Sequence, residues 1–333
     1  MAQEPDRLLG ESPAFLRILE EVSQVAPLDK PVLIVGERGT GKELIAARLH
    51  FLSNRWEGQY LKMNCAAISD SLLETELFGH EAGSFTGATR AHQGRFERAN
   101  GGTLFLDELA NTSPMVQEKL LRVIEYGEYE RVGGNKTLHC DVRLIAATNE
   151  DLPALADAGS FRSDLLDRLA FDVLTLPPLR EREQDILLLA ESFAVSMASE
   201  LGREYFPGFS VRARASLLEY DWPGNVRELK NVVERCVYRH DSTAEVETIV
   251  FDPFDSPFRP QNRSAASRQP AAATGRAEFP MDLKASVQDY EIDLINQAME
   301  AAKFNQRKAA ELLQVTYHQL RGYLKKYDLL SKE

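Results

Sequence analysis

A glycine-rich segment constrains this chain more than any other stretch. It follows the apolar run 31–35 and precedes a helix-like pattern over residues 44–49. Strand, glycine loop and helix in this order are typical of a P-loop, in which backbone N–H groups, the helix N-terminus and a lysine all face a phosphate. A plain strand-to-helix turn is the alternative, but it needs neither the repeated glycines nor the lysine. We therefore predict a nucleotide-binding segment made of Gly36, Glu37, Arg38, Gly39, Thr40, Gly41, Lys42 and Glu43.

A second apolar run, residues 101–106, ends in two adjacent carboxylates, Asp107 and Glu108. Adjacent acids repel each other and lose hydration when buried, so they seldom end a buried strand without a function. An acidic turn after a strand is the alternative. Downstream of a P-loop, Asp107 is expected to hold Mg²⁺ and Glu108 to polarise the attacking water. The two segments together predict ATP hydrolysis.

Length and charge indicate more than one domain. The chain has 333 residues, enough for about two domains. Its net charge of −12 argues against nonspecific nucleic-acid binding by the whole surface. The end of the chain differs, because residues 303–327 contain one acid, Glu311, among a cluster of cations. This cluster predicts a local DNA-binding surface. Its cations are Lys303, Arg307, Lys308, Arg321, Lys325 and Lys326.

The cysteines and the first residues of the chain indicate the compartment. Cys65, Cys140 and Cys236 are odd in number and lack metal-ligand spacing, which favours reduced thiols. Neither a membrane-spanning apolar run nor a signal peptide is apparent in the sequence. We expect a soluble protein of the cytoplasm.

The stretch 76–88 contains a Phe-Thr pair between glycines, which predicts a flexible tip with an exposed aromatic side chain. It resembles the GAFTGA loop of bacterial enhancer-binding proteins, the AAA+ activators of σ54 RNA polymerase. Ser84 stands where this family usually has Ala. The resemblance implies a σ54-contacting loop formed by Gly83, Ser84, Phe85, Thr86, Gly87 and Ala88.

The resemblance extends over about residues 8–250 and implies an α/β AAA+ P-loop ATPase with a parallel sheet, helices on both faces and a helical lid. Glu43 in the last P-loop position is the family's form. The resemblance gives Asn64 the role of restraining Glu108, although an asparagine that merely starts a turn is equally common. It implies a γ-phosphate sensor at Asn149 and a phosphate-contacting lid residue at Arg227.

Residues 161–169 resemble the family's arginine-finger segment. The resemblance implies that Arg162 and Arg168 reach the nucleotide of a neighbouring subunit in a ring, which in this family is a hexamer. Solvated helix arginines paired with Asp164 and Asp167 are the alternative.

The last part of the chain reads as a helix-turn-helix and resembles the Fis-type module of the same family. Ala309 and Ala310 are small enough for two helices to cross closely, and Val315 fills the corner. A generic helical hairpin with a basic face is the alternative. The residues expected to bind enhancer DNA, as a dimer, are Arg307, Lys308, Thr316, Tyr317, His318, Gln319, Arg321 and Lys325.

Four segments are predicted. They are an α/β ATPase subdomain over 1–176, a helical lid over 177–252, a Pro-rich flexible linker over 253–280 and an all-α helix-turn-helix domain over 281–333.

The ATPase segment starts almost at Met1, so we expect a member without a sensory domain, acting in a stress response and inhibited in trans by another protein. Trp56, on a polar connection, is the candidate docking residue for that inhibitor. The alternative is that its ring packs against the core beside Phe51 or Tyr60.

Three other functions remain open at this stage. The chain could activate a different σ54-dependent operon, or it could be an AAA+ machine that remodels another client. It could also be a DNA-binding protein whose ATPase has decayed, but the intact Lys42, Asp107, Glu108 and Arg168 argue against that.

Overall fold

The computed structural model describes residues 8–85, 88–240, 243–254, 259, 283–302 and 305–327. The chain forms two compact units, residues 1–253 and 254–333. Most of the linker predicted over 253–280 lies outside the described residues. No helix of the described part is long and apolar enough to cross a membrane.

The first unit begins with an α/β region. Its elements are α1 (Pro13–Val25), β1 (Val32–Val35), α2 (Lys42–Phe51), β2 (Tyr60–Asn64), α3 (Asp70–Phe78), α4 (Arg95–Arg98), β3 (Thr103–Asp107), η1 (Leu109–Asn111), α5 (Pro114–Tyr126), β4 (Glu128–Glu130), β5 (Thr137–His139), β6 (Arg143–Thr148), α6 (Leu152–Asp157), α7 (Ser163–Leu169) and β7 (Val173–Thr175). A helical lid follows, with η2 (Leu179–Glu181), α8 (Glu183–Glu200), α9 (Val211–Glu219) and α10 (Asn225–Arg239).

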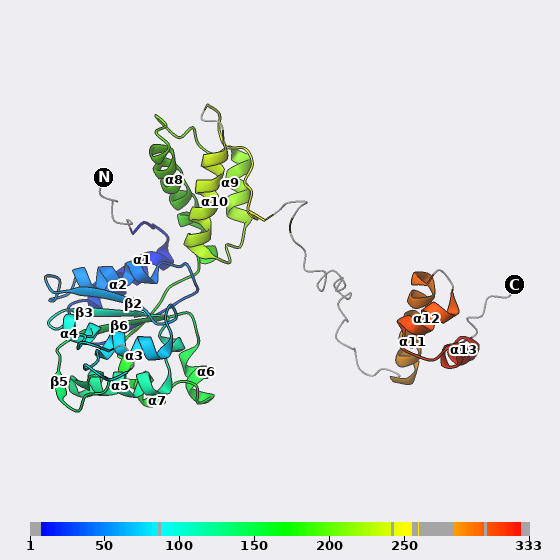
Figure 1. Cartoon of the computed structure of the whole chain (residues 1–333). Helices are drawn as coiled ribbons and strands as arrows, with labels where there is room; N and C mark the ends of the chain where they lie inside the picture. Colours follow the sequence, from blue (N-terminus) through cyan, green and yellow to red (C-terminus); the bar gives the residue numbers. More distant parts are fainter. Residues whose placement is uncertain are drawn as a thin grey trace. The chain divides into compact units, whose positions relative to one another are not determined.

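The five strands of the main sheet lie in the order β2-β3-β6-β1-β7, and every pair is parallel. Strands β4 and β5 form a separate antiparallel hairpin. The predicted parallel α/β sheet is confirmed. In Figure 1 the sheet lies between α1 and α2 on one face and α3, α5 and α7 on the other.

Side chains of the central strands alternate between these two faces. In β6, Leu144 and Ala146 pack with the helices α3, α5 and α7, whereas Ile145 and Ala147 pack with α1 and α2. All four are buried, as continuous apolar runs require when both faces of a parallel sheet are covered. The core is therefore two apolar layers with the sheet between them.

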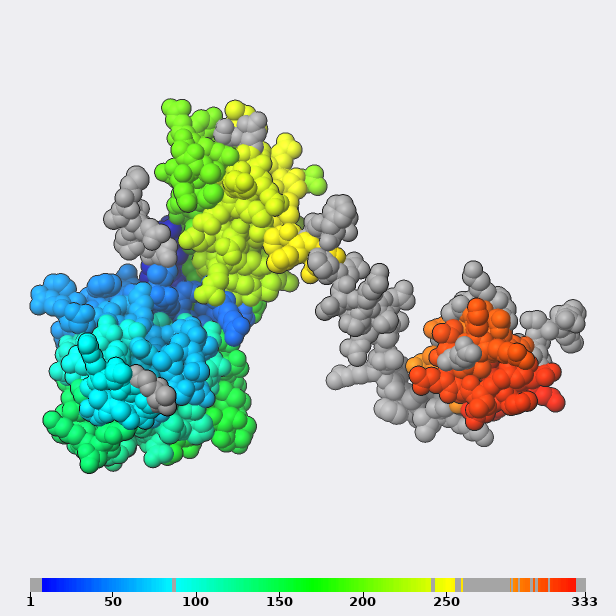
Figure 2. Space-filling model, in the orientation of Figure 1, coloured from blue at the N-terminus to red at the C-terminus, as the bar shows by residue number. Residues whose placement is uncertain are grey.

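The lid has an apolar core of its own around Trp222, which is fully buried and donates its indole N–H to the Leu217 carbonyl at 2.9 Å. Helices α8, α9 and α10 stand together as a bundle beside α1 (Figure 1), and Figure 2 shows the lid (green to yellow) meeting the blue surface of the α/β region.

The second unit contains α11 (Leu283–Ala301), α12 (Gln306–Leu312) and α13 (Tyr317–Lys326). Ala309 and Ala310 are buried between the helices with Leu320 and Leu324, as the predicted helix-turn-helix requires. Thr316 caps α13 in a capping box with Gln319.

A buried carboxylate joins the lid to the start of the chain. Asp185 of α8 accepts hydrogen bonds from the backbone N–H groups of Glu11 (2.6 Å) and Ser12 (2.8 Å) and from the Ser12 hydroxyl (2.8 Å). Arg182 Nε donates to the same carboxylate at 2.7 Å, and both side chains are almost completely buried. Burial raises the pKa of Asp185, but these hydrogen bonds outweigh it and leave the pKa lowered. Ser12 in turn caps α1, whose first residue is Pro13, the residue type that suits the first helical position.

Replacing this carboxylate is expected to destabilise the first unit strongly. Asp185→Ala leaves the Arg182 guanidinium buried without its partner, and such losses cost about 3 kcal/mol. Urea unfolding at pH 7 measures the change. The difference from the parent should shrink as the pH falls, because a carboxylate with a lowered folded pKa stabilises only while ionised. The matched control is Glu191→Ala on the same helix, which removes an exposed ion pair with Arg214 and should change stability by less than about 1 kcal/mol. Equal effects of the two variants would contradict the analysis.

Candidate functional site

The P-loop joins the end of β1 to the start of α2 at the carboxyl edge of the sheet. Gly39 and Gly41 have positive φ angles of 79° and 96°, which glycine adopts without strain. The Gly36 N–H donates to the Thr148 carbonyl of β6 at 3.2 Å, so the loop is fixed to the neighbouring strand. The local sequence pattern thus produces the predicted strand–loop–helix.

Lys42 is nearly buried at the base of this loop. Its Nζ donates to the carbonyls of Gly36 (2.8 Å) and Glu37 (3.1 Å). Burial lowers the pKa of Lys42, while the charges of Asp107 and Glu108 act in the opposite direction. The cation is therefore solvated by backbone carbonyls and lies in the field of the two acids. An anionic phosphate would stabilise it further.

The two acids close the same edge of the sheet. Asp107 is the last residue of β3, and one of its oxygens accepts the Glu108 N–H at 3.0 Å. Burial raises the pKa of Asp107, with smaller opposing effects from that hydrogen bond and from Lys42. Glu108 has a left-handed backbone (φ 54°), which is unusual for a residue other than glycine and is found most often at functional sites. Motif reasoning identified Glu108 but did not foresee this conformation.

Two asparagines lie at this edge, at the ends of β2 and β6, which flank β3 on either side. Asn64 ends β2 and lies opposite Asp107 in the strand register. Its side-chain oxygen accepts the Ala66 N–H at 2.9 Å, the turn geometry that was the alternative to a contact with Glu108. Within the described residues, Asn64 and Glu108 share no hydrogen bond, so the restraint of Glu108 stays a prediction. Asn149 follows β6, and its amide donates to the Glu150 carboxylate at 3.2 Å.

The predicted arginine fingers lie on or next to α7, and each pairs with an acid of its own chain. Arg162 contacts Asp164 at 2.6 Å, as the alternative proposed. Arg168 contacts Glu125 of α5 at 2.6 Å rather than Asp167. Helix α5 starts near the carboxyl end of β3 and ends close to Gly127. The Gly127 carbonyl accepts the Cys140 N–H, and Cys140 lies shortly before the start of β6. Glu125, in the last turn of α5, is therefore near the amino ends of the strands. This is the opposite edge of the sheet from the P-loop.

The lid reaches the P-loop through the start of α10. The Arg227 N–H donates to the Gly39 carbonyl at 3.3 Å. A Cβ atom on Gly39 would lie 2.2 Å from the Gly224 carbonyl oxygen, so the two segments touch and only glycine fits. The charge of Arg227 also acts on Lys42, which places its guanidinium in the field of the phosphate site.

The loop expected to contact σ54 has a closed base. The Gly83 N–H donates to the Ala88 carbonyl at 2.7 Å, and the Ala88 N–H donates to the Phe85 carbonyl at 3.0 Å. Phe85 is 48% exposed and packs edge-on against the His80 ring, with centroids 4.9 Å apart. Ser84 packs against the hairpin turn at Gly133. Thr86 and Gly87, also predicted for this loop, lie outside the described residues.

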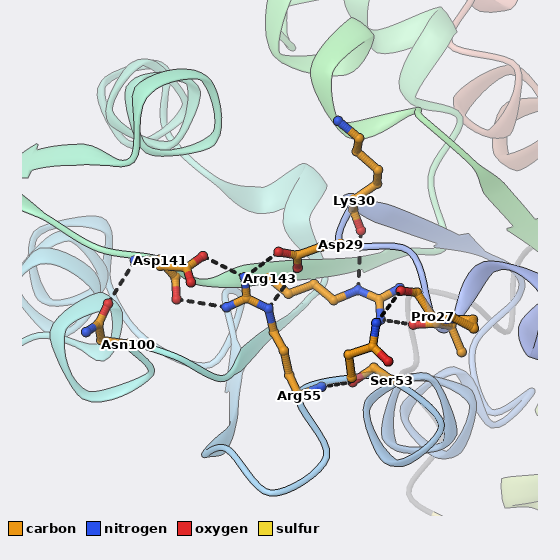
Figure 3. Close-up of polar contacts among 10 residues, drawn as sticks. Pro27, Asp29, Lys30, Ser53, Arg55, Asn100, Asp141 and Arg143 are labelled. Carbon is orange, nitrogen blue, oxygen red and sulfur yellow. Dashed lines mark hydrogen bonds and ion pairs between the residues drawn. The ribbon is translucent and has the colours of Figure 1, made fainter.

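The connection that carries Trp56 is held in place by its neighbour, Arg55 (Figure 3). The Arg55 guanidinium pairs with the carboxylates of Asp29 and Asp141, and the Asp141 N–H donates to the Asn100 side chain at 2.8 Å. Trp56 itself is 56% exposed, so its ring does not pack into the core. Nothing in the local sequence indicated the Arg55 contacts, because their partners are far away in the chain.

The second unit presents the residues predicted to bind DNA on α12 and α13. Thr316 caps α13, so Tyr317, His318 and Gln319 form its first turn. Of the basic cluster, Arg307, Lys308, Arg321, Lys325 and Lys326 are exposed, and Lys303 lies outside the described residues.

Three family models match the chain. The model described as the sigma-54 interaction domain matches residues 8–175. The model described as an AAA+ ATPase lid domain matches residues 180–270, and the model described as a bacterial regulatory protein of the Fis family matches residues 286–327.

Individual proteins also match. The chain is 58% identical over 330 residues to the Psp operon transcriptional activator of Escherichia coli, covering 99% of this chain and 100% of that protein. It is 51% identical over 230 residues to the transcriptional regulatory protein ZraR of Salmonella typhimurium, covering 69% of this chain and 52% of that protein. Among solved structures, NtrX from Brucella abortus in complex with ATP has a TM-score of 0.68 and 30% identity, covering 97% of this chain and 69% of that chain.

Proposed function

The chain belongs to the family of σ54-dependent transcriptional activators with an AAA+ ATPase domain, and we propose that it assembles into a ring that remodels σ54 RNA polymerase by ATP hydrolysis. The observation that carries the proposal is the single edge of the sheet at which Lys42, Asp107 and Glu108 meet. The phage shock operon is the proposed target, because the similarity to the E. coli Psp activator spans both chains. Another σ54-dependent operon, or another client, is the alternative.

The acids suit Mg²⁺ bound together with ATP. One oxygen of Asp107 accepts the Glu108 N–H, and within the described residues the other has no protein hydrogen bond. Burial of a carboxylate favours a nearby cation, and Mg²⁺ in such sites commonly takes one carboxylate, water and phosphate oxygens. Glu43 pairs with Lys62 at 2.7 Å, so we assign the metal to Asp107 and not to Glu43. The ion would neutralise charge on the phosphates, and Glu108 would orient and polarise the attacking water.

A ring accounts for the position of Arg168. Arg168 contacts Glu125 near the amino edge of the sheet, whereas the P-loop lies at the carboxyl edge. An arginine at one edge does not serve the phosphates at the other edge of its own subunit, but it can serve those of a neighbour. We propose that Arg168 and Arg162 stabilise charge on the transferred phosphoryl group in trans within a hexameric ring.

Complementation between inactive subunits tests this arrangement. Arg168→Ala and Glu108→Ala are each expected to lower kcat by about 10³-fold or more when assayed alone. A mixture should regain activity, because some interfaces then combine an intact Glu108 with an intact Arg168. The measurement is phosphate release as a function of mixing ratio. Absence of rescue at every ratio would contradict a finger acting in trans.

The loop of residues 83–88 is proposed to contact σ54. The half-exposed Phe85, on a loop whose base is closed by backbone hydrogen bonds, supports this, because an exposed aromatic side chain on a loop is typical of a partner-binding site. Asn64 is proposed to restrain Glu108 until this loop engages, because Asn64 ends β2 opposite Asp107 and the chain continues from it through α3 to the loop.

Removing the threonine hydroxyl should separate hydrolysis from transcription. Thr86→Ala is expected to keep the ATPase within about three-fold of the parent and to lose open-complex formation, because the described part of the loop packs at the hairpin turn with Gly133 and makes no hydrogen bond to Lys42, Asp107 or Glu108. The matched control is Thr248→Ala, an exposed lid threonine that should leave both readouts unchanged. Normal transcription by Thr86→Ala would mean that this loop is not the coupling element.

The second unit is proposed to bind an upstream enhancer as a dimer. In the first turn of the proposed recognition helix α13, His318 is exposed and Tyr317 is partly exposed, while the Gln319 side chain accepts the Thr316 N–H in the capping box. The exposed Arg307, Lys308, Arg321 and Lys325 would supply phosphate contacts. Half-sites are expected one helical turn apart, roughly 34 Å. Binding to DNA would raise the local concentration of the ATPase near its promoter.

Regulation is proposed to act through an inhibitor protein that docks at Trp56. An indole that is 56% exposed next to a fixed arginine is a rigid apolar anchor, the residue type that contributes most at protein interfaces. Trp56→Ala should therefore raise expression from the phage shock promoter in unstressed cells to nearly the induced level, with the purified ATPase unchanged.

A reporter assay with and without stress measures this effect. Tyr205→Ala, which removes an exposed aromatic ring of the lid, is the control and should stay inducible. If Trp56→Ala is as strongly repressed as the parent, the inhibitor docks elsewhere.

A further inference from the structure

Three side chains from distant parts of the chain meet between the P-loop and the lid. Glu37 is the second residue of the P-loop, Arg180 lies in η2 directly after the sheet, and Asn225 is the first residue of α10. Arg180 donates to both oxygens of Glu37, from Nη1 at 3.0 Å and from Nη2 at 2.6 Å. Asn225 Nδ2 donates to Glu37 Oε2 at 3.0 Å and to the Arg38 carbonyl at 3.0 Å. The P-loop is thus bound to both chain segments that lead into the lid.

Asn225 suits this position for two reasons. Its backbone is left-handed (φ 52°), which asparagine tolerates better than most residues. Its side chain is fully buried, and its oxygen accepts the Leu179 N–H at 2.8 Å while its amide serves the P-loop. Because both the oxygen and the NH₂ group of this buried amide are hydrogen-bonded, its neighbours must supply a donor on one side and an acceptor on the other.

The contact continues to the lid residue that faces the phosphates. Two residues after Asn225, the Arg227 N–H donates to the Gly39 carbonyl at 3.3 Å. The start of α10 is therefore attached to the P-loop at Glu37, Arg38 and Gly39, and any shift of these three residues moves the base of the Arg227 side chain.

Phosphate would act on this attachment through Lys42. The Lys42 Nζ donates to the Gly36 carbonyl at 2.8 Å and to the Glu37 carbonyl at 3.1 Å. An ammonium that turned to a phosphate would release the Glu37 carbonyl, while the Glu37 carboxylate is held by Arg180 and Asn225. The hydrogen bond from Arg180, and after it the one from Asn225, lowers the pKa of Glu37 to about 2, so the carboxylate stays ionised at physiological pH.

We propose that Glu37, Arg180 and Asn225 form a latch that sets the position of the lid according to the phosphate occupancy of the P-loop. The three are positioning residues of the ATPase, which act through Arg227 and through the P-loop backbone. The inference rests on the proposed binding of ATP at this P-loop.

Exchanging donor and acceptor tests the latch in the full-length protein. Asn225→Asp keeps the backbone preference and the acceptor for Leu179, but it removes the amide donor and sets a second carboxylate against Glu37. We expect about a ten-fold rise in the KM for ATP and a smaller change in kcat, together with a lower Tm because the new carboxylate is buried beside Glu37. Glu37→Gln, which is isosteric and half-exposed, should raise the KM by about three-fold.

The double variant Glu37→Gln with Asn225→Asp reverses the pair, because the new amide can donate to the new carboxylate. Its KM should return to within about three-fold of the parent, a rescue that a purely structural effect of either substitution does not produce. The control is Glu191→Gln, which removes an exposed ion pair within the lid and should leave the KM unchanged.

The outcomes separate the latch from the nucleotide site. The nucleotide site itself is tested by binding of a fluorescent ATP analogue, which the parent should bind and Lys42→Ala should not. If the parent binds no analogue, both the proposed ATP site and the latch are overturned. If the parent binds and both single variants keep its KM, the latch alone is overturned. A double variant no better than the worse single variant also overturns it. Should Asn225→Asp fail to fold, an unchanged KM in Glu37→Gln overturns the latch.

Discussion

The parallel direction of all five strands is the constraint on which the catalytic site depends. Because parallel strands end at one edge, the P-loop after β1, Asn64 at the end of β2 and Asp107 at the end of β3 come together there. The hydrogen bond from Gly36 to the Thr148 carbonyl fixes the P-loop to β6 at the same edge. Buried strands thus set the spacing of the functional groups, and the loops need little packing of their own.

Charge burial at this edge prepares the site for phosphate. Lys42 loses hydration, and backbone carbonyls replace part of it. Asp107 also loses hydration, and Glu108 has an uncommon backbone conformation. These are costs in the unliganded protein, and a polyphosphate with its metal would relieve them, because it supplies anions to the lysine and a cation to the acids. The free energy gained by burying the two apolar layers, one on each face of the sheet, offsets the cost of burying these charged groups.

The lid is attached to the α/β region largely by polar contacts, whereas each region has an apolar core of its own. Asp185 binds the segment before α1, and Asn225 binds the P-loop. Polar contacts of this kind can be exchanged without exposing much apolar surface, so a lid can change its position while its core stays intact. This arrangement suits an ATPase in which the state of the nucleotide has to reach distant surfaces.

The sequence by itself determined the P-loop, the acidic strand end, the parallel α/β class and the helix-turn-helix, because each depends on glycines, apolar runs or caps within a few neighbouring residues. Only the tertiary structure decided what the isolated polar residues do. Glu37 and Asn225 are 188 positions apart, and Arg55 and Asp141 are 86 apart. The exposure of Trp56 and the pairing of Arg168 with Glu125 likewise follow from packing. A hydrogen bond between distant residues leaves no local periodicity, since it forms only after folding has brought the two segments together.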